Sequence, residues 1–337
     1  MFRYTGQNWD YTLNQVFFDY LGLRAPDHYL ESVGKDLGET TGNIIAKSYQ
    51  VLQQEAPDAL LILGDTNSAL SAISAKRLKI PIFHMEAGNR CWDWNVSEMI
   101  NRKIVDHISD INMPYTEHSR RYLLSEGLDG NTLFVTGSPM REVLDDNMEG
   151  ILASDVLDTL KLKKDNYILV SAHREENIDN EEHFMSLMTA INDIAEKYKM
   201  PVIYSTHPRS KKFIELRNFK FHPLVQSLKP FGFLDYNKQQ VNAYCVLSDS
   251  GTLSEESAML IRTSTERPEV LDKGTVVIGG VTTKDIEQAL EIAVTMRDNN
   301  EKTEMPDDYH DTNVSVKVVK LIQSYAKIVN ETGRNKI

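Results

Sequence analysis

The sequence predicts an α/β protein made of two doubly wound domains. Its 337 residues are enough for two domains of about 150 residues each. Short apolar, β-branched segments alternate with helical patterns, which indicates parallel sheets with crossover helices. The alternation stops at the polar segment Lys161–Asp165 and then starts again. We therefore expect domains at residues 1–162 and 163–310, followed by a C-terminal helix within residues 311–337.

Four predicted strands lie in the first half, and each is followed by small or polar residues. They are Ala59–Leu63, Ile80–Phe83, Asp110–Met113 and Leu133–Val135. A helical pattern from Ala69 to Leu78 connects the first two strands. This order is typical of parallel strands joined by crossover helices.

The second half repeats the pattern with four more predicted strands. They are Tyr167–Ser171, Val202–Ser205, Tyr244–Leu247 and Thr275–Ile278. A helix is expected over about Glu181 to Lys199. The last helix opens at Asp311-Thr312-Asn313, which are good N-caps, and its apolar positions are Val316, Val318, Val319, Ile322 and Ala326.

Composition excludes several classes of protein. With 37 basic and 49 acidic residues the net charge is 37 − 49 = −12, which argues against a general nucleic-acid binder. Two cysteines cannot form a disulfide framework, and the nine histidines include no zinc motif, so we expect no metal. No apolar run approaches the ~20 residues of a membrane span, and no signal peptide is visible. We expect a cytoplasmic protein.

Ligands of parallel sheets bind beyond the carboxyl ends of the strands, so polar residues there are the candidates. With two such domains, we expect the site in the cleft between them. Asp65 follows a strand directly and is either a helix N-cap or a carboxylate that faces the ligand. Glu86 follows the next strand; partial desolvation there favours proton transfer, whereas pairing with Arg90 would make it a surface-loop residue.

Three further segments carry candidate side chains. For Glu98, the pattern alone favours a capping box with a solvated charged face. His173 follows a strand of the second half and precedes Arg174, a side chain suited to phosphate. A lone histidine is usually structural, but this one lies where the sheet meets the expected ligand. His207 follows the strand Val202–Ser205.

The segment Ser248–Glu256 is a strand end, a turn of small residues and a helix start. Free amides at such a helix start favour an anion, and Glu256 can accept hydrogen bonds from ribose hydroxyls. The charged turn Thr265–Glu269 is, from the pattern alone, a solvated loop.

Taken together, these segments resemble the non-hydrolysing UDP-N-acetylglucosamine 2-epimerase family. The matching strings occur in the family's order and cover nearly the whole chain: Thr5-Gly6-Gln7, Gly64-Asp65-Thr66, His84-Met85-Glu86-Ala87-Gly88, Glu98 with Asn101-Arg102, Thr136-Gly137-Ser138-Pro139, His173-Arg174-Glu175, Ser248-Asp249-Ser250-Gly251 with Glu255-Glu256, and Thr265-Glu266-Arg267-Pro268-Glu269. The forms of residues 84–90, 101–107 and 262–269 look closer to the capsule and O-antigen branch, which makes UDP-N-acetyl-L-fucosamine from UDP-2-acetamido-2,6-dideoxy-L-talose.

The resemblance implies a GT-B-like fold of two Rossmann-like domains, with the last helix crossing back to the first domain. It implies a UDP-sugar substrate, no metal or redox cofactor, and a homodimer. The family's catalytic positions fall on Asp65, Glu86, Glu98 and His173. The substrate contacts that it implies, together with those suggested by strand ends, are Gln7, Arg102, Arg174, His207, Ser250, Gly251, Glu256 and Arg267.

Two departures from the family pattern stand out. The family begins with a strand and a Gly-Thr-Arg-Pro-Glu turn, whereas this chain starts about where that unit ends. Between Glu256 and Arg267 the chain is several residues shorter than the pattern, with no room for the expected turn and strand. Either segments are omitted from the sequence or the chain is a degraded copy of the family pattern; because the flanking motifs are intact, we favour omission.

The chemistry implied is inversion of carbon 2 by elimination of UDP and its re-addition to a glycal. It needs proton-exchanging groups at both faces of the sugar and cations for the diphosphate. The alternatives are a UDP-N-acetylglucosamine 2-epimerase that forms UDP-N-acetylmannosamine, a GT-B glycosyltransferase, and a non-catalytic UDP-sugar binder.

Overall fold

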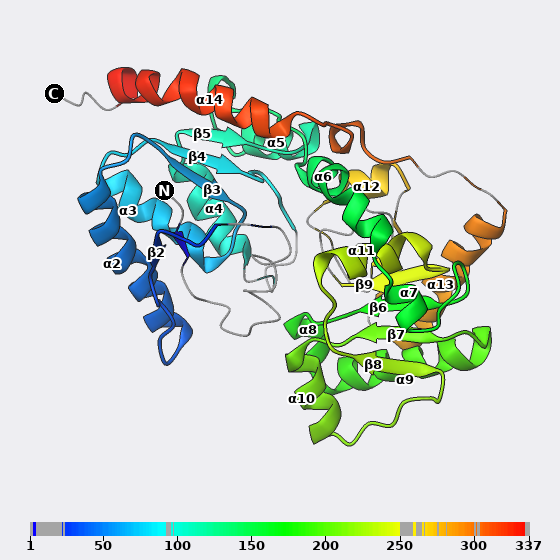
Figure 1. Cartoon of the computed structure of the whole chain (residues 1–337). Helices are drawn as coiled ribbons and strands as arrows, with labels where there is room; N and C mark the ends of the chain where they lie inside the picture. The colour runs from blue at the N-terminus through cyan, green and yellow to red at the C-terminus, as the bar shows by residue number, and fades with distance from the viewer. Residues whose placement is uncertain are drawn as a thin grey trace. The chain divides into compact units, whose positions relative to one another are not determined.

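The computed structural model describes residues 3–4, 22, 24–91, 96, 98–249, 259–260, 265, 267–274, 276–280, 282–299, 301 and 304–333. The chain divides into two compact units. Unit 1 comprises Met1–Asn14, Leu23–Leu144 and Pro306–Ile337, and unit 2 comprises Gln15–Gly22 and Asp145–Met305. Each unit contains a parallel sheet with helices on it, which confirms the predicted α/β class (Figure 1).

The main sheet of unit 1 has three parallel strands in the order β3 (Leu60–Leu63), β4 (Ile82–Met85) and β5 (Ile111–Met113). These strands were expected from the sequence. The fourth expected strand makes only a single parallel bridge, from Leu133 to Asn112. Separately, β1 (Arg3–Tyr4) pairs in parallel with β2 (His28–Tyr29).

Alternate residues of β4 serve different faces of this sheet. Ile82 belongs to the apolar cluster that includes Leu52 of α2 (Leu37–Glu55) and Val105 of α4 (Glu98–Ile108). Phe83 and Met85 point to the other cluster, which α14 (Val314–Ile328) completes. Helices therefore cover both faces, which is why all four side chains of β4 are buried.

The C-terminal helix returns to unit 1, as expected (Figure 1). Val314 and Val318 are its buried residues, and they pack with Phe83 and Ile111. The predicted apolar face is partly wrong, because Val316 and Val319 are 50% and 58% exposed. The residues that follow the helical period in this cluster are Val314, Val318, Leu321, Ile322, Tyr325 and Ala326. Asn313 occupies the N-cap position but its side chain makes no capping bond.

Unit 2 has a five-stranded parallel sheet in the order β10-β9-β6-β7-β8. Its strands are β6 (Ile168–Ser171), β7 (Val202–Ser205), β8 (Val225–Leu228), β9 (Cys245–Ser248) and β10 (Met259–Leu260). The strand predicted at 275–278 is wrong, because only a single bridge forms, at Ile278, in the described part of that segment. The expectation that no strand fits between Glu256 and Arg267 is also wrong, since two residues are enough to pair with Leu247 and Ser248.

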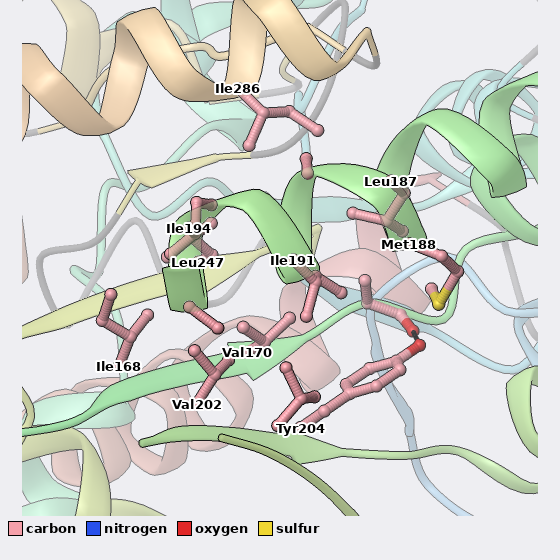
Figure 2. Close-up of a cluster of buried hydrophobic side chains, with 14 of the residues drawn as sticks. Ile168, Val170, Leu187, Met188, Ile191, Ile194, Val202, Tyr204, Leu247 and Ile286 are labelled. Carbon is pink, nitrogen blue, oxygen red and sulfur yellow. Dashed lines mark hydrogen bonds between the residues drawn. The ribbon is translucent and has the colours of Figure 1, made fainter. Parts of the chain in front are cut away.

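The core of unit 2 lies between this sheet and helices α9 (Glu181–Tyr198) and α13 (Thr283–Asp298). Figure 2 shows Ile191 and Ile194 of α9 lying over Val170 and Val202 of the sheet. Each fully buried aliphatic side chain of this kind contributes about 1.5–3 kcal/mol. The sheet is therefore a firm base for the polar residues at its carboxyl edge.

The remaining helices connect or cover these elements. They are η2 (Asn67–Leu70), α3 (Ser71–Arg77), α5 (Glu117–Ser125), η3 (Gly130–Thr132), α6 (Met140–Ala153), α7 (Val156–Thr159), α8 (Glu175–Ile178), α10 (Pro208–Leu216), α11 (Phe233–Asn242), α12 (Glu269–Asp272), η5 (Asp307–Tyr309) and η6 (Val329–Gly333). Across the described ranges, none of the helices has the length and apolar character that crossing a bilayer requires.

Candidate active site

Two acidic side chains follow neighbouring strands of unit 1. Asp65 comes after β3 and Glu86 comes after β4, and the register pairs Leu63 with Met85. Glu86 has φ +64°, a left-handed conformation that side chains other than glycine seldom adopt. A Cβ placed on Gly64 would lie 3.2 Å from Oε2 of Glu86. The Glu86 carboxylate therefore lies directly beside the turn that carries Asp65.

Helix α4 fixes the position of Asp65. Arg102 places Nε and Nη2 each 2.6 Å from Oδ2 of Asp65. Asn101 donates from Nδ2 to the Asp65 carbonyl at 2.9 Å. The N-cap position of η2 is Thr66, so the interpretation of Asp65 as a helix N-cap is wrong. Its carboxylate is instead held by a guanidinium.

Glu86 is not paired with Arg90, which corrects the surface-loop alternative. Oε1 of Glu86 accepts a hydrogen bond from Nδ2 of Asn89 at 3.1 Å. Arg90 is turned inward, with Nη1 2.7 Å from Asp106 and Nη2 2.7 Å from Glu126. These other carboxylates therefore neutralise the charge of Arg90. The Glu86 carboxylate is held at its own turn by Asn89.

Glu98 is the first residue of α4, on the same helix that holds Asp65. The predicted solvated face is wrong, because Asn101 and Arg102 are only 7% and 5% exposed. Glu98 precedes Arg102 by four residues, which places both on one side of the helix. The helix side that carries Glu98 is therefore the side that contacts the Asp65 turn.

A buried cluster of charges lies beneath these turns. His84 is 1% exposed, with Nδ1 2.8 Å from Oδ1 of Asp106 and Nε2 2.9 Å from the Gly64 carbonyl oxygen. Both partners can only accept, so both ring nitrogens carry protons. Burial lowers the pKa of His84, but the hydrogen bond and charge of Asp106 outweigh it, and the net pKa is raised. Asp106 also accepts from the Gly88 amide at 3.2 Å and thereby joins the two turns.

In unit 2, three neighbouring strands end in polar residues of the segments that the sequence singled out. His173 follows β6, His207 follows β7 and Asp249 follows β9. The rings of His173 and His207 stack with centroids 5.4 Å apart and an angle of 25°. Nδ1 of His207 accepts from the Arg209 amide and caps α10. The carboxyl edge of this sheet therefore gathers two imidazoles and one carboxylate.

Arg174 and Arg267 both make hydrogen bonds, Arg174 through its side chain and Arg267 through its backbone amide. Nε of Arg174 donates to the Asp249 carbonyl at 2.8 Å. The Arg267 amide donates to Oγ1 of Thr265 at 3.1 Å, and Arg267 is only 3% exposed. The solvated loop expected over Thr265–Glu269 is therefore wrong at Thr265, Arg267 and Glu269, which are all buried.

Four predicted site residues lie outside the described residues: Gln7, Ser250, Gly251 and Glu256. Sequence reasoning missed His84, Asp106 and Asp249 as site residues. His84 and Asp249 lay inside segments already singled out, but their partners are distant in the sequence. Asp106 carried no local signal, because its contacts with His84 and Gly88 span 22 and 18 residues.

Comparison with known proteins agrees with this geometry. The family model described as UDP-N-acetylglucosamine 2-epimerase matches residues 2–323. A solved UDP-N-acetylglucosamine 2-epimerase from Rickettsia bellii is 45% identical, with a TM-score of 0.87 over 98% of this chain and 90% of that one. The Methanocaldococcus jannaschii UDP-GlcNAc 2-epimerase, solved in complex with UDP-GlcNAc and UDP, is 30% identical with a TM-score of 0.87 over 95% and 90%.

A curated relative has a different substrate in its name. The UDP-2,3-diacetamido-2,3-dideoxy-D-glucuronate 2-epimerase of Pseudomonas aeruginosa is 31% identical over 284 residues, which are 82% of this chain and 79% of the relative. The solved relatives share the GT-B-like fold expected from the sequence. The family match and the names of these relatives favour an epimerase over a glycosyltransferase or a non-catalytic binder. The chain belongs to the UDP-N-acetylglucosamine 2-epimerase family and is an isomerase, a UDP-sugar 2-epimerase.

Proposed function

We propose that this epimerase inverts carbon 2 of a UDP-N-acetylamino sugar and that its product is UDP-N-acetyl-L-fucosamine. The observation that carries the catalytic part is the pair of carboxylates at neighbouring strand ends, Asp65 held by Arg102 and Glu86 beside Gly64. Groups fixed in this way can exchange protons with a sugar carbon without first having to be ordered.

The reaction is an elimination followed by re-addition. A base removes the proton from carbon 2, the bond between carbon 1 and the diphosphate oxygen breaks, and its electron pair leaves with UDP. A double bond between carbons 1 and 2 remains, which is a glycal. UDP then adds back to carbon 1 while a proton returns to carbon 2 on the opposite face. This route avoids a free carbanion, which no neighbouring carbonyl could stabilise.

We assign the residues to roles in this route. Asp65 and Glu86 transfer protons or stabilise the charged intermediate. Glu98 and His173 serve the second proton transfer or contact the leaving group. Catalysis by such positioned acids and bases typically contributes 10²–10⁴-fold.

The departing diphosphate needs cationic and amide contacts. We propose Arg174 and Arg267 for the charge, with Arg102 and His207 as further substrate contacts. Gln7, Ser250, Gly251 and Glu256 complete the proposed contacts. The hydrogen bond from Nε of Arg174 to the Asp249 carbonyl supports this role, because it restricts the orientation of the guanidinium.

The choice of sugar rests on the forms of residues 84–90, 101–107 and 262–269. The names of the solved relatives favour a second candidate, conversion of UDP-N-acetylglucosamine to UDP-N-acetylmannosamine. The Pseudomonas aeruginosa relative supports neither sugar, but its name indicates that substrates differ within this group of relatives.

The test is to incubate the purified protein with each UDP-sugar separately, with no acceptor, and to identify products by proton NMR. Our proposal predicts conversion of UDP-2-acetamido-2,6-dideoxy-L-talose with a kcat/KM at least tenfold above that for UDP-N-acetylglucosamine. The opposite preference supports the second candidate. No conversion of any UDP-N-acetylamino sugar contradicts the proposed function.

Three further proposals depend on the same resemblance: a homodimer, a cytoplasmic location, and a place in capsule or O-antigen synthesis. Sedimentation velocity of the purified chain tests the first. A single species with the 38.4 kDa mass of one chain contradicts it.

A further inference from the structure

The two carboxylate oxygens of Asp249 differ in the hydrogen bonds that they accept. The side chain is completely buried. Oδ2 accepts from the amides of His173 and Arg174, both at 2.8 Å, and from Nδ2 of Asn177 at 3.0 Å. Within the part of the chain that the structure describes, no group donates a hydrogen bond to Oδ1, and Nδ1 of His173 lies 3.4 Å from it.

This arrangement determines which nitrogen of His173 carries the proton. A buried carboxylate oxygen without a donor costs free energy, and the nearby ring nitrogen can serve as that donor. Because a carboxylate only accepts, contact with Oδ1 favours the tautomer with a proton on Nδ1. The separation of 3.4 Å is longer than that of a usual N–H···O hydrogen bond, and catalytic contacts of this kind often shorten when substrate binds.

The other side of the ring is arranged for exchange. The His173 side chain is 43% exposed, and its ring stacks on His207. Nδ1 of His207 accepts from the Arg209 amide, so His207 offers no proton there. With the backbone of His173 held by Oδ2 and its plane held by His207, Nε2 is the nitrogen left to face a reacting group.

We propose that Asp249 is a positioning residue that keeps the proton of neutral His173 on Nδ1, so that Nε2 is the atom that exchanges a proton with the substrate. This inference rests on the proposed function for the role of His173. Asp249 itself does not contact the sugar. It acts through the imidazole, as the buried aspartate does in the catalytic triad of serine proteases.

The Asp249→Asn variant separates the effect of Asp249 on the His173 tautomer from the hydrogen bonds that its other oxygen accepts. The amide has the shape of the carboxylate, and its oxygen can keep the hydrogen bonds from His173, Arg174 and Asn177. Its NH₂ group then faces Nδ1 of His173 and requires an acceptor there. We expect the proton to move to Nε2 and kcat to fall about 100-fold or more, with KM changed by less than about threefold.

The experiment is NMR of the full-length chain labelled with [¹⁵N]histidine, in which two-bond ¹H–¹⁵N correlations distinguish the tautomers. His173→Gln assigns the signals by their loss. Wild-type His173 should show a protonated Nδ1, and Asp249→Asn a protonated Nε2. Asn177→Ala is the matched control, because it removes a donor to Oδ2 and leaves Oδ1 untouched; its His173 should keep the Nδ1 proton.

The outcomes test the tautomer of His173 separately from its proposed catalytic role. A wild-type His173 with its proton on Nε2 overturns the inference, whether or not Asp249→Asn folds. An Asp249→Asn protein that keeps the wild-type tautomer also overturns the inference. This includes the case in which the kcat of Asp249→Asn falls no further than the kcat of Asn177→Ala. Full turnover by His173→Gln contradicts the proposed role of His173, whereas the tautomer measurement stands apart from that result.

Discussion

At the scale of single residues, the proposed reaction depends on Asp65 and Glu86. Different partners hold each of these carboxylates. Asp65 is fixed by two guanidinium contacts at 2.6 Å, and Glu86 by the Asn89 amide and an unusual backbone angle. We expect Asp65→Asn and Glu86→Gln each to lower kcat about 100-fold or more, because an amide cannot take up a proton. Glu291→Gln, at an exposed side chain, is the control. Steady-state rates near the wild-type value in either variant would remove the proposed roles.

Glycines at the two turns give a second prediction. Gly88 has φ +82°, and an added Cβ would lie 2.5 Å from the Ser119 carbonyl oxygen. Gly88→Ala should lower the free energy of unfolding by about 2–4 kcal/mol, from left-handed strain and overpacking. At Gly64 the Cβ would be 3.2 Å from Glu86, so Gly64→Ala should lower kcat as well as stability.

Gly42→Ala in α2 is the matched control for these glycines, because nothing lies within 4 Å of its added Cβ. It should raise stability by about 0.5–1 kcal/mol, the usual gain for alanine within a helix. Urea unfolding and steady-state kinetics measure all three variants. A Gly88→Ala protein as stable as Gly42→Ala would mean that the turn is not held as described.

At this scale the sequence predicted which side chains follow strands wherever the signal was local. Asp65, Glu86 and His173 each follow an apolar run, so the ends of the runs located them. The contacts of Asp249 with His173 span 76 residues, and local patterns carry no trace of such a pairing. The solvated loop that the pattern predicted around Arg267 was wrong for the same reason, since a charged turn is buried only when distant residues cover it.

At the scale of elements, a cluster of charged side chains joins β4, α4 and Glu126, the residue that follows α5 (Glu117–Ser125). Asp106 raises the pKa of His84 against the effect of burial. The hydrogen bond from Arg90 lowers the pKa of Glu126 to about 2, although burial opposes this. Stability from His84 is therefore complete below its ordinary pKa of 6.5 and is lost as pH rises through the raised value. Stability from Glu126 is complete above 4.5 and is lost as pH falls toward 2.

This gives a pH-dependent prediction for two variants. The difference in melting temperature between wild type and His84→Gln should be smaller at about pH 8.5 than at about pH 5.5. The difference between wild type and Glu126→Gln should be smaller at about pH 3 than at about pH 5.5. Thermal unfolding followed by circular dichroism measures both. Differences that stay constant across these pH values are incompatible with the charged cluster.

At the scale of the whole molecule, the last helix belongs to unit 1 although residues 145–305 form unit 2. Val318 of α14 is buried with Phe83 and Ile111, whereas Val316 is half exposed. Val318→Asp should lower the free energy of unfolding by about 3 kcal/mol or more, because it buries a charge without a partner. Val316→Asp should change it by less than about 0.5 kcal/mol. Equal effects in urea unfolding would place the helix elsewhere.

At this scale, the parallel sheets could be predicted from the sequence, whereas the edge of the unit 2 sheet could not. Alternating strands and helices identified parallel sheets in both halves, because period and segment length are local properties. The edge of the unit 2 sheet was predicted wrongly: Thr275–Ile278 has strand composition, yet Met259–Leu260 pairs with β9. Edge strands are selected by what lies beside them, which composition does not encode.

In the proposed reaction, protein side chains remove the proton from carbon 2, and a proton returns on the opposite face. The direct measurement is turnover of the UDP-N-acetylamino sugar in heavy water without an acceptor, followed by proton NMR and mass spectrometry of the product. We expect one deuterium at carbon 2 of every inverted molecule, from the first turnover onward. Inverted product that retains its original hydrogen at carbon 2 would contradict it.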